Sequence, residues 1–106
     1  MNNFINISDL SKNELRSIID GAKKRKSERG KKPNSQPDTD QPIKGKTMIM
    51  LFAKPSTRTR ISFDLAVNQL GGSSIILNQD EIHYGKGDET IKDTAKVLSQ
   101  YADILM

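Results

Sequence analysis

The chain contains no cysteine, which excludes disulfide bonds and thiolate metal sites. It also lacks any apolar run near the roughly 20 residues that cross a bilayer, so we expect no membrane partner. Its first ten residues, MNNFINISDL, lack the basic and then apolar arrangement of a signal peptide. These absences predict a soluble, cytoplasmic protein. With 106 residues and a mean hydropathy of −0.62, the chain forms one domain at most, with much exposed surface.

Positive charge is concentrated in one segment. The net charge is +4, yet residues 23–32 (KKRKSERGKK) hold seven basic residues and one acidic residue. The rest of the chain has ten basic and twelve acidic residues, a net charge of −2. A basic segment near a helix C-terminus favours the helix dipole and needs no partner, and no aromatic residue is present there for base stacking. We therefore expect no nucleic-acid partner, with nucleic-acid binding through this segment as the alternative.

The first third of the chain predicts a surface helix followed by a connector. Ser11 and Glu14 have the spacing of a capping box, and apolar residues follow at helical intervals. Gly30 is a plausible end of this helix. Residues 31–42 contain three prolines and no aliphatic residue, so we expect residues 30–43 to form an exposed connector.

The remaining sequence alternates strands with helices. The predicted elements are a strand at 46–52, a helix at 60–72, a strand at 73–78, a helix at 90–102 and the opening of a strand at 103–106. The order α-β-α-β-α-β predicts an α/β fold, part of an open parallel sheet flanked by helices. Apolar residues on two sides of the 60–72 helix predict its deep burial. A parallel sheet needs both faces covered, yet only two complete strands are present and the sequence stops in an apolar run, so we expect a truncated domain.

Hydroxyl groups and guanidinium groups gather where the first strand meets its helix, in Ser56, Thr57, Arg58, Thr59 and Arg60. Ligands of open parallel sheets bind outside the carboxyl ends of the strands, and a helix N-terminus offers unpaired N–H groups there. Added hydroxyl and guanidinium donors make a cradle for a phosphate. No glycine lies between Phe52 and Gly71, so this is not a glycine-rich phosphate loop.

A purely structural interpretation stands beside this one. Serine and threonine are common N-caps, and both arginines could be surface or ion-paired residues. Arg58 and Arg60 point roughly 200° apart on a helix, so one can face a ligand while the other does not. Asp64 follows Arg60 by four residues, which predicts a helical ion pair.

The segment FAKPSTRTRISFD resembles the signature of the aspartate and ornithine carbamoyltransferases, and residues 69–106 resemble the next stretch of that family's sequences in order and spacing. The resemblance covers residues 10–106. Lys54 and the IHYGKGDE loop are more similar to the ornithine branch. The resemblance implies that Ser56, Thr57, Arg58 and Thr59 bind carbamoyl phosphate, with Arg58 and Thr59 catalytic beside the carbamoyl group. It implies no cofactor and no metal.

His83 is the only histidine and lies in a polar loop with no second metal ligand beside it. Without the resemblance we would interpret it as an exposed loop residue with no role. With the resemblance, it becomes a carbamoyl-phosphate contact, in a loop that reaches the neighbouring subunit of a homotrimer.

The implied reaction is carbamoyl transfer to the δ-amine of L-ornithine, which gives L-citrulline and phosphate in arginine metabolism. Residues 1–106 would be the N-terminal part of the carbamoyl-phosphate-binding domain, without the amino-acid-binding domain, and inactive alone. Two alternatives stay open: a carbamoyltransferase for another amine, such as aspartate or putrescine, and a non-catalytic anion-binding domain.

Overall fold

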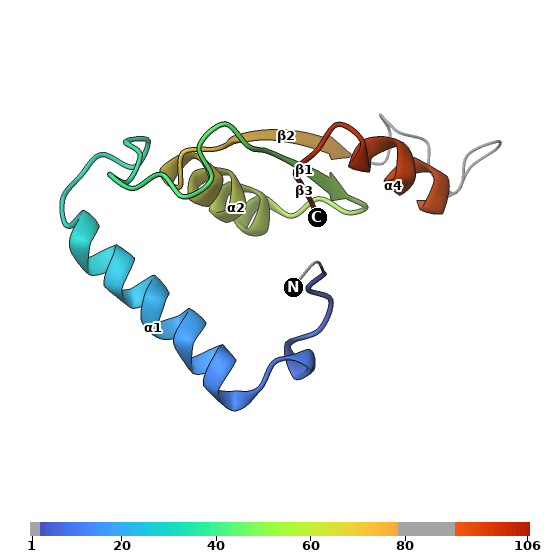
Figure 1. Cartoon of the computed structure of the whole chain (residues 1–106). Helices are drawn as coiled ribbons and strands as arrows, with labels where there is room; N and C mark the ends of the chain where they lie inside the picture. The colour runs from blue at the N-terminus through green and yellow to red at the C-terminus, as the bar shows by residue number, and fades with distance from the viewer. Residues whose placement is uncertain (1–2, 79–90) are drawn as a thin grey trace. The chain divides into compact units, whose positions relative to one another are not determined.

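The structure, a computed structural model, describes residues 3–78 and 91–106. Its elements in chain order are the 3-10 helix η1 (Ile7–Asp9), α1 (Lys12–Arg29), β1 (Thr47–Phe52), α2 (Thr57–Gln69), β2 (Ser73–Asn78), α4 (Ile91–Ser99) and β3 (Ile104–Leu105) (Figure 1). They divide into two units, Met1–Lys32 and Pro33–Met106. Within the described residues, no helix is long and apolar enough to span a membrane.

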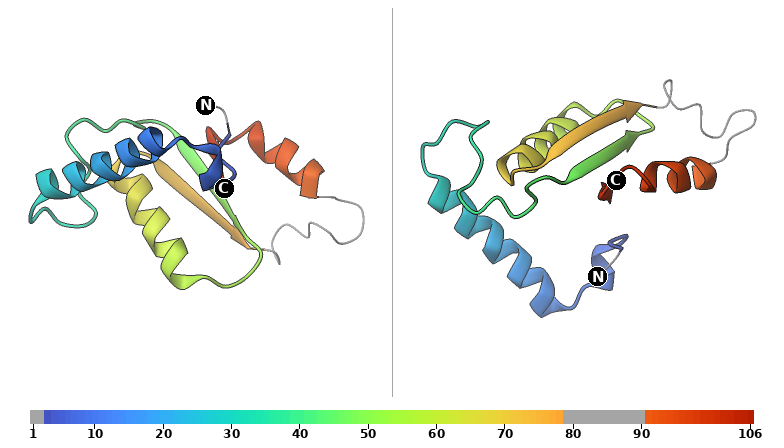
Figure 2. Two further views of the ribbon diagram at one scale, coloured as in Figure 1. Left: turned by 90° about the horizontal axis from the view of Figure 1, so that it is seen from below. Right: turned by 45° about the horizontal axis from the view of Figure 1, so that its top comes forward.

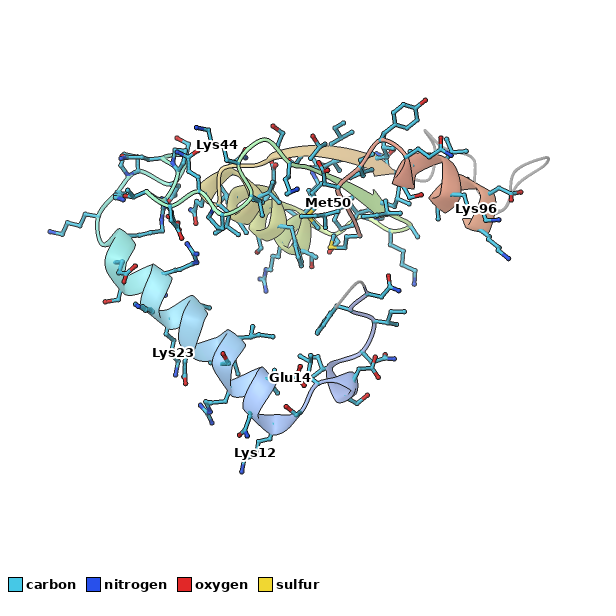
Figure 3. The ribbon with its side chains drawn as sticks, in the orientation of Figure 1. Lys12, Glu14, Lys23, Lys44, Met50 and Lys96 are labelled. Atoms are coloured by element: carbon cyan, nitrogen blue, oxygen red, sulfur yellow. The ribbon has the colours of Figure 1, made fainter. Side chains whose placement is uncertain are left out.

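The first unit is built on α1, which begins at the predicted capping box. The Glu14 N–H donates to Ser11 Oγ at 3.1 Å, and the Ser11 N–H donates to Glu14 Oε1 at 2.9 Å. The bond from the Ser11 N–H, followed by the Ser11 side-chain bond, lowers the pKa of Glu14. The helix ends at Gly30, whose φ of 55° suits glycine. Lys12 and Lys23, labelled in Figure 3, are exposed, as is typical of a surface helix.

The second unit contains a three-stranded sheet in the order β2-β1-β3, with every pair parallel. Thr47 pairs with Ser73 and Phe52 with Asn78, so β1 and β2 end at the same edge of the sheet (Figure 2). The Leu51 N–H donates to the carbonyl of Met106 at 2.7 Å beside the short β3. The predicted open parallel α/β fold is confirmed.

The core lies on the central strand. Met48, Ile49 and Met50 are all buried, and because successive strand residues face opposite sides, both faces of β1 are covered there. Met50, labelled in Figure 3, is fully buried and clusters with Met48 and with Val67 of α2.

The predicted deep burial of the second helix is wrong. Val67 is the one buried residue of α2, whereas Ile61 is 51% exposed and Phe63 is 40% exposed. The helix packs along β2 (Figure 2), and Val67 joins the buried cluster on β1, while Ile61 and Phe63 stay exposed. Apolar residues on two sides therefore did not mean burial on two sides.

The predicted exposed connector, residues 30–43, is exposed at most side chains but not at Asp38, which is buried. The Asp38 N–H donates to the carbonyl of Gln69 at 2.7 Å, and the Ile43 N–H donates to the carbonyl of Leu70 at 3.1 Å. The last carbonyl groups of a helix lack partners within it. The N–H groups of the connector supply these partners at the end of α2. Asp38 is therefore held against the end of the helix, where it is buried.

Candidate anion-binding site

The segment between β1 and α2 differs from the sequence prediction in where the helix starts. α2 begins at Thr57 rather than at residue 60, because the carbonyl of Ser56 accepts the first helical bond, from the Arg60 N–H at 3.0 Å. The N–H groups of the three residues before Arg60 therefore have no acceptor within the helix. The Ser56 side chain makes no capping bond, so its hydroxyl is not used by the helix. These donors lie at the N-terminus of α2.

A pocket of about 230 Å³ lies beside this N-terminus, where β1 and β2 end. Its lining residues come from the end of β1, the loop after it, the first turn of α2 and β2; they are Phe52, Ala53, Lys54, Pro55, Ser56, Arg60, Ile76 and Asn78. An adjoining pocket of about 220 Å³ is lined by Pro55, Ser56, Thr57, Arg60 and Ile61. The site is therefore at the carboxyl ends of the strands, where open parallel sheets bind their ligands.

The lining of the first pocket is positively charged. Lys54 and Arg60 both line it, and none of its lining residues is acidic. Arg58 and Arg60 make no ion pair with any residue in the described part of the chain. The helical pair expected between Arg60 and Asp64 is not formed, since the Asp64 carboxylate accepts a hydrogen bond from Ser74 Oγ instead. Hydroxyl donors, free N–H groups and two cations suit an oxyanion.

The structure brings some of the predicted site residues to the pocket and leaves others at its rim. Ser56 is half-buried and lines both pockets, and Thr57 lines the second. Arg58 and Thr59 are exposed on the first turn and line neither. His83 lies outside the described residues.

Sequence reasoning gave no binding role to Lys54 or Asn78, which line the pocket, and named Arg60 among the cradle residues without assigning it to the phosphate. A signal for Asn78 was present, because it is the last residue of β2 and pairs with Phe52 at the end of β1. Arg60 was set aside because of Asp64, and nothing in the local sequence indicated that Asp64 would bond elsewhere. The described residues hold no group of three His, Cys, Asp or Glu side chains that could bind a metal.

The second unit is therefore an open-sheet α/β domain with a cationic pocket at the carboxyl ends of its strands. The sequence matches, over residues 2–106, the family described as "Aspartate/ornithine carbamoyltransferase, carbamoyl-P binding domain". The chain therefore belongs to this family of carbamoyltransferases.

Curated relatives support this membership. The chain is 46% identical over 106 residues to the ornithine carbamoyltransferase of Paracoccus denitrificans, covering 100% of this chain and 34% of that protein. It is 48% identical over 103 residues to the ornithine carbamoyltransferase of Nitrobacter winogradskyi, covering 97% and 32%. The chain spans about a third of the length of the curated relatives it matches.

Solved structures share the fold. The anabolic ornithine carbamoyltransferase of Campylobacter jejuni superposes with a TM-score of 0.78 at 34% identity, over 100% of this chain and 32% of that one. The catalytic subunit of M. jannaschii aspartate transcarbamoylase gives 0.80 at 35% identity, over 99% and 33%. Both branches of the family are therefore similar to this chain in fold.

Proposed function

We propose that this chain is the carbamoyl-phosphate-binding part of an ornithine carbamoyltransferase. The observation that carries the proposal is the cationic pocket between Lys54, Ser56 and Arg60, at the open N-terminus of α2. Carbamoyl phosphate presents a phosphate dianion, which suits such donors. The curated relatives that match the whole chain are named ornithine carbamoyltransferases, which favours ornithine as the amine.

In the proposed reaction the δ-amine of ornithine attacks the carbonyl carbon of carbamoyl phosphate. A tetrahedral oxyanion forms, and phosphate leaves to give citrulline. Ser56, Thr57, Arg58 and Thr59 bind the phosphate, and Arg58 and Thr59 also donate toward the carbamoyl oxygen as charge develops. His83 adds a further contact. A donor of this kind contributes about 3 kcal/mol to the transition state.

The complete enzyme is part of the proposal too. Residues 1–106 form the N-terminal part of the carbamoyl-phosphate-binding domain, and a separate amino-acid-binding domain supplies the contacts to ornithine. The enzyme is a cytoplasmic homotrimer of arginine metabolism. Because this chain would hold the phosphate but not the amine, it forms no citrulline alone.

A chimera tests the proposal. The third of the Paracoccus denitrificans ornithine carbamoyltransferase that this chain matches is replaced by residues 1–106. We expect the chimera to form citrulline from carbamoyl phosphate and ornithine, and to leave aspartate unreacted. Arg58→Ala should lower its turnover about 10²-fold or more, whereas Lys12→Ala, at an exposed position of α1, should have no effect.

Two results would contradict the proposal. One is near-normal turnover of the Arg58→Ala chimera, which would remove Arg58 from the site. The other is citrulline formation by residues 1–106 alone, which would show that the amine site lies within this chain. Carbamoylation of aspartate in place of ornithine would be consistent with the proposed phosphate site but would contradict ornithine as the amine substrate.

A further inference from the structure

The helix α1 carries an apolar stripe that stays largely exposed within its own unit. Leu15, Ile18, Ile19 and Ala22 recur at the i, i+3, i+4 and i+7 spacing of one helix face, within about 100° of arc. Ile18 is 55% exposed and Ile19 is 40% exposed. Neither η1 nor α1 holds a buried residue. The first unit therefore has an apolar face but no core.

A unit of this size cannot supply the missing cover by itself. Below about 40 residues, a chain usually needs disulfides, metals or association with another chain segment to be stable. The first unit ends at Lys32, and its other large apolar side chains, Phe4, Ile5 and Ile7, are exposed as well. Since removing apolar surface from water is favourable, the stripe has the properties of a docking surface.

We propose that this stripe docks against a helix from the part of the full-length enzyme that lies outside residues 1–106. The inference rests on the proposed function, because it takes this chain as one part of a complete ornithine carbamoyltransferase. The chain spans 34% of the length of the Paracoccus denitrificans relative, so about two thirds of that protein is available to provide the cover.

Charge beside the stripe defines the chemistry of the docking helix. Lys12, Arg16 and Lys23 lie within about 40° of one another and next to Ile19; both lysines are labelled on α1 in Figure 3. None of the three cations forms an ion pair with a described residue. An apolar helix with acidic residues along one side matches this surface. Its carboxylates would lie at the rim beside the cations, where charge fixes orientation more than affinity.

A basic flank beside an apolar stripe is also found in helices that bind anionic membranes. Such helices carry Trp, Phe and Leu on a long apolar face, whereas this stripe has four residues and no aromatic side chain. The composition of the stripe therefore favours a protein segment over a membrane surface.

Cysteine labelling tests the docking, because the chain contains no cysteine of its own. Ile18→Cys and Ile19→Cys each place a thiol on the stripe. Ser17→Cys is the matched control, since it places a thiol at an exposed position on the opposite face of the same turn. Each variant is made in the 106-residue chain and in the Paracoccus denitrificans chimera. The labelled peptide is identified by mass spectrometry after timed exposure to a maleimide, and citrulline formation is measured on the same samples.

In the 106-residue chain, we expect the three thiols to react at similar rates. In the chimera, the thiols of Ile18→Cys and Ile19→Cys should react about 10²-fold more slowly or less, because reaction requires the docked helix to open. The thiol of Ser17→Cys should keep its rate. A carbodiimide, which joins amines to carboxylates, should couple Lys23 of the chimera to an acidic residue outside residues 1–106.

Each other outcome overturns a defined part. Equal rates for the three thiols in a chimera that forms citrulline would overturn the docking and leave the proposed function intact. Absence of coupling to Lys23 would overturn the acidic character of the docking helix. A chimera that forms no citrulline would contradict the proposed function, and the inference would fall with it.

Other occupants of the stripe give different results in the 106-residue chain. Slow labelling of the stripe at every protein concentration would mean that residues 33–106 cover it. Labelling that slows as the protein concentration rises would mean that a second copy covers it. Slow labelling only on phosphatidylglycerol vesicles, with no slowing in the chimera, would identify a membrane surface. Each of these three results would overturn the proposal.

Discussion

Ser74 on β2 donates a hydrogen bond to the carboxylate of Asp64 on α2, ten residues earlier in the chain. The bond connects the helix that carries the hydroxyl and arginine residues to the strand that pairs with β1. The Asp64 carboxylate is thus bonded to the sheet, and Arg60 lines the pocket without an acidic partner among the described residues.

The turn between α2 and β2 should tolerate no side chain at Gly71. Its φ is +94°, and a Cβ built there would lie 2.7 Å from Cβ of Gln41. The positive φ and the close contact both strain an alanine at this position. We therefore expect Gly71→Ala to lower the free energy of unfolding by about 1–3 kcal/mol. Urea unfolding followed by circular dichroism measures this change.

Gly21 in α1 provides the matched control. A Cβ there would meet nothing within 4 Å, and the position is inside a helix. Gly21→Ala should therefore stabilise α1 by about 0.5–1 kcal/mol. An unfolding free energy that is unchanged or higher in Gly71→Ala would show that the turn does not have the described conformation.

The capping box should make the helicity of α1 depend on pH. The N–H and hydroxyl of Ser11 lower the pKa of Glu14 below its ordinary value. A carboxylate with a lowered folded pKa stabilises the helix above its unfolded pKa, and this stabilisation is lost as the pH falls through the folded pKa. We expect the circular dichroism signal of α1 to weaken across that acidic range.

Glu14→Gln is the control for this pH dependence, because the amide still accepts the bond from Ser11 but does not titrate. The difference between the two titrations isolates Glu14 from the other carboxylates of the chain. Identical pH profiles of the original chain and Glu14→Gln would mean that the capping bond does not couple to protonation.

Local signals predicted most of the fold. The capping box at Ser11 marks the start of α1 and Gly30 marks its end, as predicted. Both features act through hydrogen bonds within one turn, so the local sequence is enough to predict them. The apolar run at 46–52 predicted β1 and its burial. The alternation of strands and helices predicted parallel pairing, which the sheet shows. A helix that connects two neighbouring strands returns the chain to the same end of the sheet, so the strands run parallel.

The missed features depend on contacts between distant segments. The burial of Asp38 follows from bonds to the end of α2, and the exposure of Phe63 follows from which elements cover the helix. Arg60 was misjudged because the local spacing to Asp64 is a sound signal for a pair, but Ser74 on another element competes for the same carboxylate. The pocket at the strand ends lies where the sequence predicts a ligand, whereas the place of Lys54 and Asn78 in its lining was found only from the structure.

The central claim is that the donors at the start of α2 bind a phosphoryl group. The direct measurement is a calorimetric titration of carbamoyl phosphate into the chain and into a variant with residues 56–59 changed to alanine, with Lys23→Ala on the exposed face of α1 as control. The account predicts saturable binding by the chain and the control, and binding at least about 10²-fold weaker in the alanine variant. Equal affinity in all three proteins would contradict it.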